Sequence, residues 1–421
     1  MEATSGRARV IVQSSEVNYR MRSIELFAGA AGLGLGLAEA GFHHEIVVEK
    51  DHDACETIRY NQRRGHALVR DWKVVEADAD DVRLDGIAPE PDLLSGGPPC
   101  QNFSIGGNHA GADGDRNLWP TTFRYVNALR PRAFVFENVP GLMSSHADYL
   151  EYITMALTLP EIACPPADDW KDQASFLRRC IEQKTRSVPT YRVSVEKLTA
   201  TDYGTAQARS RVFVVGIRDD MDAAWVRPDA THSLDQLMRD KWMTGEYWER
   251  HGLDRPEIDK AGLAFMRRHN RSSSDDLFAR RLLAHRTTRD ALIGLPEPTP
   301  EGTPGILDHE AATRQARAYK GHTGSAIDDP SKTLRAGDHG VSGGENMIDY
   351  GEAAGDRRYR HFTVREAARM QGFPDDYAFP VPSDGGGRGG KWSAGLKQLG
   401  NAVPCEMARA VGRSVASVLN A

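Results

Sequence analysis

The segment Pro98-Pro99-Cys100-Gln101 contains the candidate for the most reactive side chain in this chain, a cysteine that follows two prolines. The prolines restrict the backbone directly before the thiol, and glycines on both sides allow another molecule to approach closely. This setting favours a presented, nucleophilic thiol. A cysteine that only fills space is the alternative, because free cysteines commonly pack as small apolar side chains.

A carboxyl group that could handle a proton follows an apolar strand. Glu137 comes directly after Phe134-Val135-Phe136, where ligands bind at the edge of a parallel sheet. Partial burial would raise the pKa of this carboxyl group and let it donate a proton at neutral pH. An N-cap or ion-paired glutamate is the structural alternative.

A cluster of cationic and amide side chains precedes another apolar run. Gln207, Arg209 and Arg211 lead into Val212–Val215, and period-2 alternation predicts that all three share one face. Two guanidinium groups and an amide on one face suit a carboxylate, a phosphate or a base carbonyl. Solvated arginines on an edge strand are the alternative.

A glycine turn separates a first strand, residues 23–27, from a helix over 33–40. Such turns bind nucleotide-like ligands in open α/β sheets. The spacing of Gly29, Gly32 and Gly34 is not the dinucleotide fingerprint. Glu49 ends the second strand and could hold two ribose hydroxyls. A tight turn that serves packing alone is the alternative.

These residues require a framework of alternating strands and helices. Further strands are predicted at 46–49, 73–76, 92–94, 133–136 and 212–217, and further helices at 52–61, 118–129, 364–371 and from 404 onward. The alternation predicts an α/β fold with a doubly wound, mainly parallel sheet. We interpret residues 160–190 as a linker-like insertion.

Composition limits the class of protein. With 421 residues and 40% hydrophobic residues, the chain can form two or three domains. The apolar runs are far shorter than the roughly 18 residues that span a bilayer. The first residues lack a secretory pattern, and five cysteines without a CxxC pair predict free thiols in the cytoplasm and no metal site.

The charge is unevenly distributed. A net charge of −6 argues against a wholly basic nucleic-acid coat protein. Residues 263–289 are nevertheless rich in arginine, which is typical of a surface that contacts phosphates or of a solvated helix face.

Seven motifs in this order resemble the DNA cytosine-5 methyltransferases of bacterial restriction-modification systems, over most of the chain outside 220–330. The motifs are Phe27-Ala28-Gly29, Glu49, Pro98-Pro99-Cys100-Gln101, Glu137-Asn138-Val139, Gln207 with Arg209 and Arg211, the stretch from Arg365-Glu366-Ala367 to Gln371-Gly372-Phe373-Pro374, and Gly400-Asn401-Ala402-Val403-Pro404. One departure is Ala31, where the family usually has a second glycine.

The resemblance implies a class I S-adenosylmethionine-dependent methyltransferase fold with a smaller, irregular target-recognition domain. We expect an N-terminal extension at 1–22, a catalytic and cofactor-binding domain at 23–218, the target-recognition domain at 219–330, and a C-terminal segment at 331–421 whose last helix packs back onto the catalytic domain.

The resemblance also implies roles for individual residues. Cys100 would be the nucleophile, Glu137 the group that protonates or hydrogen-bonds the cytosine ring nitrogen, and Arg209 and Arg211 a clamp that orients the base and the active-site groups. Expected contacts to S-adenosyl-L-methionine are Phe27, Ala28, Gly29, Gly32, Glu49, Asp78, Leu118, Asn401 and Ala402, with Asp80 and Asp81 as alternatives to Asp78. Expected substrate contacts are Pro99, Gln101, Ser104, Asn138 and Gln207.

The implied reaction is sequence-specific methylation of carbon 5 of a flipped-out cytosine through a covalent adduct at carbon 6. The implied partner is double-stranded DNA in the bacterial cytoplasm, bound by a monomer, with a possible cognate restriction endonuclease acting independently. A transfer-RNA cytosine-5 methyltransferase is the alternative, and the large segment at 219–330 favours DNA. Intact Cys100 and Glu137 argue against a silent DNA-binding relative, and the missing dinucleotide fingerprint argues against a Rossmann oxidoreductase.

Overall fold

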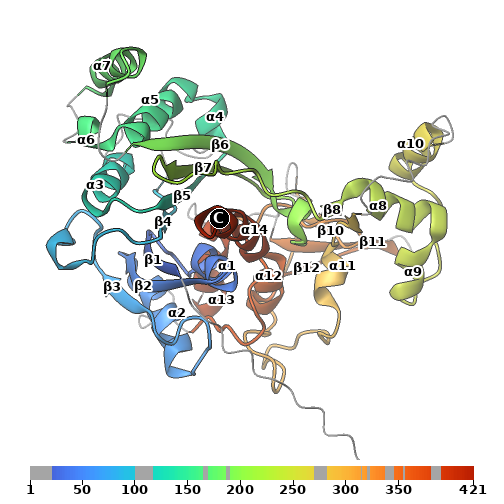
Figure 1. The fold of residues 1–421 in the computed structure, drawn as a ribbon. Coiled ribbons are helices and arrows are strands. Elements are labelled where there is room, and N and C mark those ends of the chain that lie inside the picture. The colour runs from blue at the N-terminus through green and yellow to red at the C-terminus, as the bar shows by residue number, and fades with distance from the viewer. Residues whose placement is uncertain are drawn as a thin grey trace, which may run out of the picture.

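A seven-stranded sheet forms the centre of the computed structural model (Figure 1), in the order β3-β2-β1-β4-β5-β7-β6. The structure describes residues 21–99, 117–164, 169–185, 190–269, 282–313, 315–319, 323–336, 346–353, 356–380 and 390–421. The strands are β1 (Met21–Leu26), β2 (Phe42–Glu49), β3 (Lys73–Glu76), β4 (Leu93–Gly96), β5 (Ala133–Asn138), β6 (Tyr191–Thr199) and β7 (Ser210–Arg218).

The direction of the strands fixes where a ligand can bind. The five strands β1 to β5 are parallel, whereas β7 is antiparallel to both β5 and β6. The strand order reverses between β1 and β4. Ligands of open α/β sheets bind at such a reversal, outside the carboxyl ends of the strands.

Helices cover both faces of the sheet (Figure 1). The helices that follow the first strands are α1 (Gly32–Glu39), α2 (His52–Arg63), α3 (Trp119–Leu129), α4 (Gly141–Ser144), α5 (Ala147–Thr158), α6 (Pro160–Ala163) and α7 (Trp170–Glu182). The C-terminal helices are α12 (Val364–Met370), α13 (Gly390–Asn401) and α14 (Cys405–Leu419).

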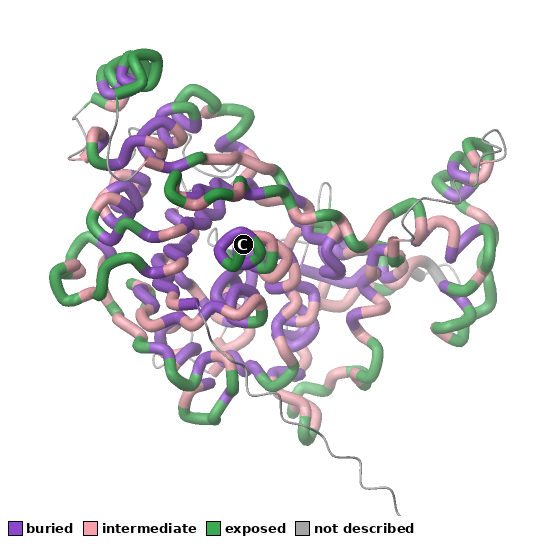
Figure 2. Tube along the Cα trace, viewed as in Figure 1, coloured by how far each residue is buried: buried purple, intermediate pink, exposed green. Residues whose placement is uncertain are grey.

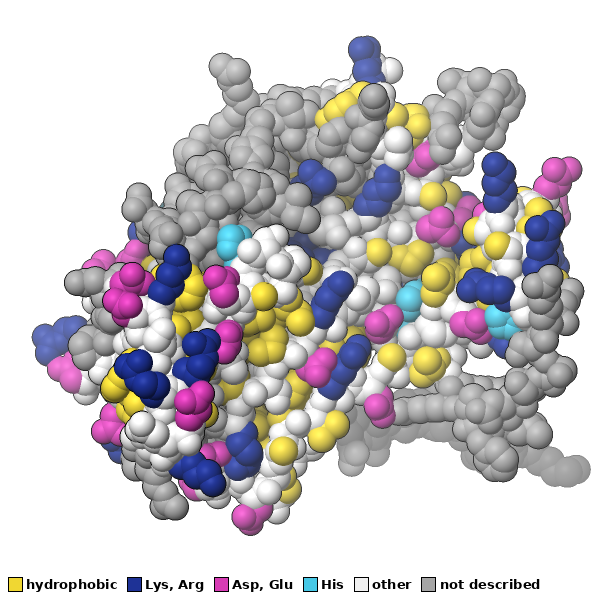
Figure 3. All heavy atoms as spheres, turned by 90° about the horizontal axis from the view of Figure 1, so that it is seen from above, with side chains coloured by type: hydrophobic (Ala, Val, Ile, Leu, Met, Phe, Trp, Pro, Cys, Tyr) yellow, Lys and Arg dark blue, Asp and Glu magenta, His cyan; other side chains and the backbone are white. Residues whose placement is uncertain are grey.

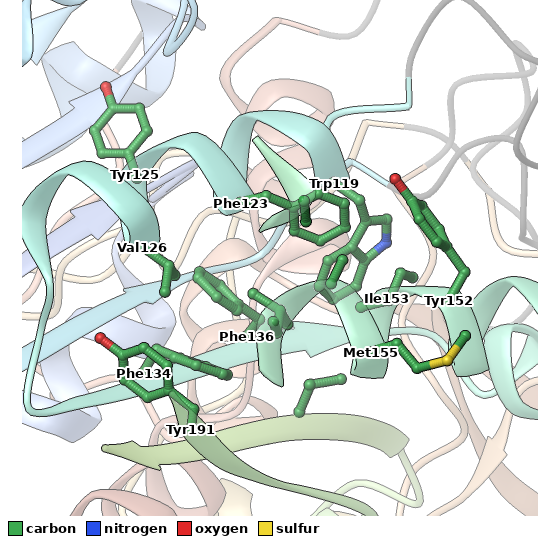
Figure 4. Close-up of a cluster of buried hydrophobic side chains, with 14 of the residues drawn as sticks. Trp119, Phe123, Tyr125, Val126, Phe134, Phe136, Tyr152, Ile153, Met155 and Tyr191 are labelled. Atoms are coloured by element: carbon green, nitrogen blue, oxygen red, sulfur yellow. The ribbon is translucent and has the colours of Figure 1, made fainter. Parts of the chain in front are cut away.

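Alternating side chains of β5 enter two different cores. Phe134 and Phe136 belong to a core with α3 and α5, whereas Ala133 and Val135 belong to a core with α1 and α14. Figure 4 shows the first of these cores, in which the rings of Trp119 and Phe136 lie 6.0 Å apart, edge to face. The sheet is therefore buried on both faces, as expected for parallel strands.

The last helix packs directly on the first one, in the core that also contains Val411 and Val415 of α14. A Cβ atom on Gly36 would lie 2.6 Å from the Cβ of Ala408 and 2.7 Å from the backbone nitrogen of Arg409. A Cβ on Gly32 would collide with the carbonyl oxygen of Val403. The glycines of α1 therefore allow the C-terminal segment to approach the N-terminal turn.

A separate group of short elements lies on the right of Figure 1, away from the large sheet. It contains β8 (His232–Ser233), α8 (Leu234–Arg239), α9 (Glu246–Arg250), α10 (Lys260–His269) and β9 (Leu283–Ala284), with α11 (Thr288–Leu292) and the three-stranded sheet of β10 (Ser325–Ala326), β11 (Met347–Ala353) and β12 (Asp356–His361) beside them. Four aromatic and apolar residues form its small core: Leu237, Trp242, Tyr247 and Trp248.

One expectation about the elements is corrected: residues 160–190 are not linker-like, because they contain α6 and α7. Helix α7 buries Ala174, Leu177 and Cys180 at three-residue intervals, a helical signal in the sequence. The strand β6, which pairs antiparallel with β7, is not among the strands predicted from the sequence. Because β7 is antiparallel to β5 as well, the parallel arrangement ends at β5. Figure 2 shows α7 at the periphery, largely exposed.

No helix within the described part of the chain is both long enough and apolar enough to cross a membrane.

The packing of α14 on α1 predicts the effect of a single methyl group. Gly36→Ala should lower the free energy of unfolding by about 1–3 kcal/mol, because the Cβ meets backbone atoms that cannot move away cheaply. This loss should occur although alanine is the better helix former by about 1 kcal/mol. Urea unfolding measures it. The control is Gly86→Ala, whose Cβ meets nothing within 4 Å, and an equal loss in both variants would contradict the packing argument.

Candidate active site

The chain leading to the predicted nucleophile is fixed by Asn138. Cys100, Gln101 and Ser104 lie outside the described residues, whereas Pro99 is described and half-buried. The buried amide of Asn138 donates from Nδ2 to the carbonyl oxygen of Pro98 over 3.2 Å, and its Oδ1 accepts from the Val139 backbone over 2.9 Å. The ends of β4 and β5 are thus joined two residues before the cysteine.

Glu137 and Arg211 form an ion pair beside this segment. Arg211 Nε lies 2.6 Å from Glu137 Oε1, and both side chains are nearly buried. Glu137 pairs in register with Phe213, so Arg211, two residues from Phe213 on β7, is its diagonal neighbour on the same face. Glu137 also lies beside Gly97, since a Cβ on that glycine would lie 3.4 Å from its Oε2.

Burial dominates the charge state of Glu137. Desolvation raises the pKa of this carboxyl group above its ordinary value, while the nearby guanidinium groups of Arg211 and Arg209 and the hydrogen bond from Arg211 partly oppose the shift. The side chain is suited to exchange a proton with a bound base.

The prediction that Gln207, Arg209 and Arg211 share one strand face is wrong for the first two. The strand β7 begins at Ser210, so Gln207 and Arg209 precede it and the alternation does not apply to them. The buried guanidinium of Arg209 donates to the carbonyl oxygens of Leu334 (3.2 Å) and Gly400 (2.7 Å). Gln207 donates to the Met370 carbonyl and accepts from the Leu334 backbone. Both side chains fasten the C-terminal segment.

The cofactor turn, which we define as Phe27–Ala31, contains an unusual run of left-handed residues. The φ angles of Phe27, Gly29 and Ala31 are 55°, 53° and 70°. Only glycine adopts this region without cost. Each other residue there costs about 1–3 kcal/mol and keeps this conformation only when its surroundings enforce it. Ala31, the departure from the expected glycine, therefore adopts the glycine-like conformation.

Glu49 supports the turn from the neighbouring strand. Its Oε2 accepts from the Gly29 backbone, and its Oε1 accepts from the Lys50 and Asp51 backbones, each over 2.7 Å. Three backbone donors fix this carboxylate at the carboxyl end of β2.

The two predicted cofactor glycines differ in their surroundings. A Cβ on Gly29 would meet nothing within 4 Å, so the chain there faces open space. Gly32, by contrast, is covered by Val403 and by Ala402, whose Cβ would lie 3.2 Å away. Its lack of a side chain serves packing of the C-terminal segment. Ala28 is buried, and its backbone donates to the Val48 carbonyl.

The acids after β3 have different partners. Asp78 Oδ2 lies 2.6 Å from the ammonium group of Lys50, the residue after Glu49. Asp80 accepts from the Thr121 hydroxyl over 2.7 Å. Asp78 is thus the acid held at the end of β2. Sequence reasoning missed Lys50, although its charge and its place after Glu49 were visible.

The remaining predicted cofactor residues lie at element boundaries. Leu118 is half-buried and immediately precedes α3, whereas Asn401 is exposed at the end of α13 and Ala402 is buried after it. Sequence reasoning also missed Tyr377, whose hydroxyl reaches the cofactor turn. Tyr377 follows a helix stop at Gly372, and only its tertiary contacts distinguish it from other loop tyrosines.

A buried acid lies beneath the turn. Glu25 Oε2 is 3.4 Å from His44 Nε2, and both side chains are almost inaccessible to solvent. Burial raises the pKa of Glu25 to about 8 and lowers that of His44 to about 4. Both groups are therefore uncharged at pH 7.

Some cationic side chains of the arginine-rich residues 263–289 form ion pairs within the protein. His285 Nε2 lies 3.2 Å from Asp202, and Arg289 Nε lies 2.6 Å from Asp328. These two side chains stabilise the structure instead of forming the solvated or phosphate-binding surface considered above. In Figure 3, Lys and Arg side chains are interspersed with Asp and Glu across the described part of the visible face.

Comparison with known proteins gives consistent matches. A family model described as C-5 cytosine-specific DNA methylase matches residues 21–159 and 177–417. The chain is 28% identical over 415 residues to the type II methyltransferase M.PspPI of Psychrobacter sp. (strain TA137), covering 94% of this chain and 79% of that protein. It is 25% identical over 401 residues to the type II methyltransferase M.FnuDI of Fusobacterium nucleatum, covering 95% of each.

The solved structure of the S. pombe Dnmt2 methyltransferase matches with a TM-score of 0.53 at 14% identity, covering 95% of this chain and 99% of that one. At this identity the likeness shows the fold alone. The predicted fold class, a doubly wound and mainly parallel methyltransferase sheet, is confirmed.

The buried Glu25 predicts a specific dependence of stability on pH. Between pH 6.5 and 8 the carboxyl group is ionised in the unfolded chain but protonated in the folded one, so the folded state binds more protons. The free energy of unfolding should therefore fall as pH rises in this window, and Glu25→Gln should remove that fall. Burial lowers the pKa of His44 from 6.5 to about 4, so His44 adds an opposite slope between these values that fades above pH 6.5 and is smaller than the Glu25 slope within the window.

We expect the difference in free energy of unfolding between Glu25→Gln and the natural chain to grow by about 1–2 kcal/mol from pH 6.5 to 8. Urea titrations at several pH values measure it. Glu56→Gln is the control, because partner arginines lower the pKa of Glu56 and keep its titration below the window. Parallel stability curves for the natural chain and Glu25→Gln would refute the assignment.

Proposed function

The chain belongs to the C-5 cytosine-specific DNA methylase family, and from this premise we propose that it transfers a methyl group from S-adenosyl-L-methionine to carbon 5 of a flipped-out cytosine in double-stranded DNA. The observation that carries the proposal is the Glu137–Arg211 pair, buried at the end of β5 and facing Gly97 in the segment that leads to Cys100.

The residues around the cofactor turn fit S-adenosyl-L-methionine. The open space at Gly29 leaves room for a ligand. Backbone donors occupy three of the about four acceptor positions of the Glu49 carboxylate, so the remaining position can accept a hydrogen bond from a ribose hydroxyl. Asp78 would accept from the adenine amino group, with Leu118 beside the ring and Asn401 near the methionine end. The cofactor supplies an electrophilic methyl group when bound.

Cysteine and glutamate together would overcome the weak nucleophilicity of carbon 5. The Cys100 thiolate adds to carbon 6 of the ring, while Glu137 gives a proton to the ring nitrogen and neutralises the developing negative charge. Carbon 5 of the resulting enamine then takes the methyl group, and S-adenosylhomocysteine would be the leaving group. Loss of the carbon 5 proton to a base, return of the ring-nitrogen proton to Glu137 and expulsion of the thiolate restore the aromatic ring.

The arginines have distinct parts in this proposal. Arg211 orients the Glu137 carboxyl and contacts the base, whereas Arg209 holds the carbonyl oxygens of Leu334 and Gly400 and so positions the cofactor residue Asn401. Asn138 keeps the Pro98 carbonyl in place ahead of the nucleophile. Pro99, Gln101 and Ser104 would line the space for the flipped base, whereas the buried Gln207 supports it from behind through its bonds to Met370 and Leu334.

Access to carbon 6 requires the base to leave the duplex, because a stacked cytosine hides both ring faces. We assign sequence reading to residues 219–330, within which Leu237, Trp242, Tyr247 and Trp248 form a small core of their own. As a monomer in the bacterial cytoplasm, the enzyme would protect host DNA from a restriction endonuclease of the same specificity. The type II methyltransferases that resemble it support this role.

Cys100→Ala should abolish methyl transfer while leaving cofactor affinity within about twofold, because the thiol acts on the base only. The assay uses labelled S-adenosyl-L-methionine with unmethylated duplex DNA or transfer RNA. Duplex DNA in which 5-fluorocytosine replaces cytosine should trap a covalent complex with the natural chain and none with the variant, since fluorine cannot leave as a proton does. Labelling of RNA alone, or an active Cys100→Ala enzyme, would contradict the proposal.

Replacing residues 219–330 by the corresponding segment of another family member should change the sequence that is methylated. The expected reason is that base-edge contacts come from this segment while the chemistry stays in the sheet. Sequencing of methylated cytosines in host DNA measures the outcome. Unchanged specificity in an active chimera would show that recognition lies elsewhere.

A further inference from the structure

We propose that Tyr377 is a positioning residue for cofactor binding, which holds the cofactor turn in its left-handed conformation from the side opposite the ligand. The inference rests on the proposed cofactor site at this turn. Tyr377 lies in the loop after α12, distant in sequence from the turn, and belongs to no motif that carries the chemistry.

The contact itself is direct. The Tyr377 hydroxyl donates to the carbonyl oxygen of Ala30 over 3.1 Å, and both residues are buried. The phenol ring is held edge to face by His66 at 5.3 Å and by Phe379 at 5.8 Å, so the hydroxyl has a fixed direction.

The loop that carries the tyrosine is itself anchored at several points. Arg365 donates to the Tyr377 carbonyl over 2.7 Å and to the Pro374 carbonyl over 3.0 Å. Asn61 of α2 both donates to and accepts from the backbone of Ala378, each over 2.8 Å. The hydroxyl is thus presented by a rigid segment that joins the C-terminal part of the chain to α2.

The turn needs such a support because two of its residues have backbone conformations that cost free energy. Phe27 and Ala31 have φ angles of 55° and 70°, which non-glycine residues adopt only when neighbours enforce them. Glu49 fixes the turn at Gly29 from the strand side. Tyr377 fixes the peptide that directly precedes Ala31 from the core side.

The consequence is a coupling between two distant parts of the chain. A turn that relaxes toward ordinary φ angles would lose its ligand-binding shape, so the hydroxyl contributes to cofactor affinity without touching the cofactor. By thermodynamic linkage, ligand binding must in return stabilise the docked position of residues 373–379.

The test compares two buried tyrosines. Tyr191 is also buried, and its hydroxyl donates to a backbone carbonyl, that of Pro131, over 2.7 Å, far from the turn. Calorimetric titration with S-adenosylhomocysteine should show five- to tenfold weaker binding for Tyr377→Phe and a change below twofold for Tyr191→Phe. In the methylation assay, Tyr377→Phe should raise KM for S-adenosyl-L-methionine by a similar factor and leave kcat within twofold.

A second substitution that restores cofactor affinity distinguishes a positioning role of Tyr377 from a general loss of stability. Ala31→Gly removes the cost of the left-handed conformation at that position, so adding it to Tyr377→Phe should restore affinity to within about twofold of the natural chain. Equal binding by Tyr377→Phe and the natural chain, or no recovery in the double variant, would overturn the inference.

Hydrogen exchange of the natural chain gives a measurement that needs no variant. S-adenosylhomocysteine should slow exchange of the Tyr377 and Ala378 amides, which bond to Pro374 and Asn61, more than that of amides in β6. Equal slowing in both places would contradict the coupling. Failure of the natural chain to bind S-adenosylhomocysteine would instead refute the proposed cofactor site.

Discussion

The close approach of the C-terminal segment to α1 is the constraint on which the rest of the structure depends. It requires Gly32 and Gly36, because a side chain at either position would meet the backbone of residues 403–409. Once α14 lies on α1, the residues before it reach the start of α1, and Ala402 lies beside Gly32, which is 370 residues earlier in the chain. The proposed cofactor site combines residues from early and late in the chain, and it therefore depends on the packing of α14 on α1.

Buried charge is the second organising feature. Glu137, Arg211 and Arg209 lie together near the ends of β5 and β7, and each is costly to bury unless it has partners. Arg211 satisfies Glu137, and Arg209 satisfies two backbone carbonyls of the C-terminal segment. One electrostatic arrangement therefore links three properties. They are the protonation equilibrium of Glu137, the orientation of Arg211, and the position of residues 334 and 400 against Arg209.

The elements of 219–330 are held together in a different way. Their core is small, and charged side chains provide much of the internal bonding, as in the contacts of Lys241 with Asp329 and of Arg289 with Asp328. Arginine content alone is therefore a poor guide to a nucleic-acid surface. An arginine that is paired with an aspartate of the same structure is less available to neutralise a phosphate. Arg286 is half exposed and lies 4.0 Å from Glu406 of α14.

The sequence alone determined the alternation of strands and helices, the acids at strand ends and the order of the motifs, since apolar periodicity and local turn chemistry are written in consecutive residues. It could not place Gln207 and Arg209, because the first residue of β7 depends on the pairing of Ser210 with Thr199. Nor could it assign Gly32 to packing or Tyr377 to the cofactor turn. Those roles arise from contacts between residues hundreds of positions apart, which only the closure of the fold brings within bonding distance.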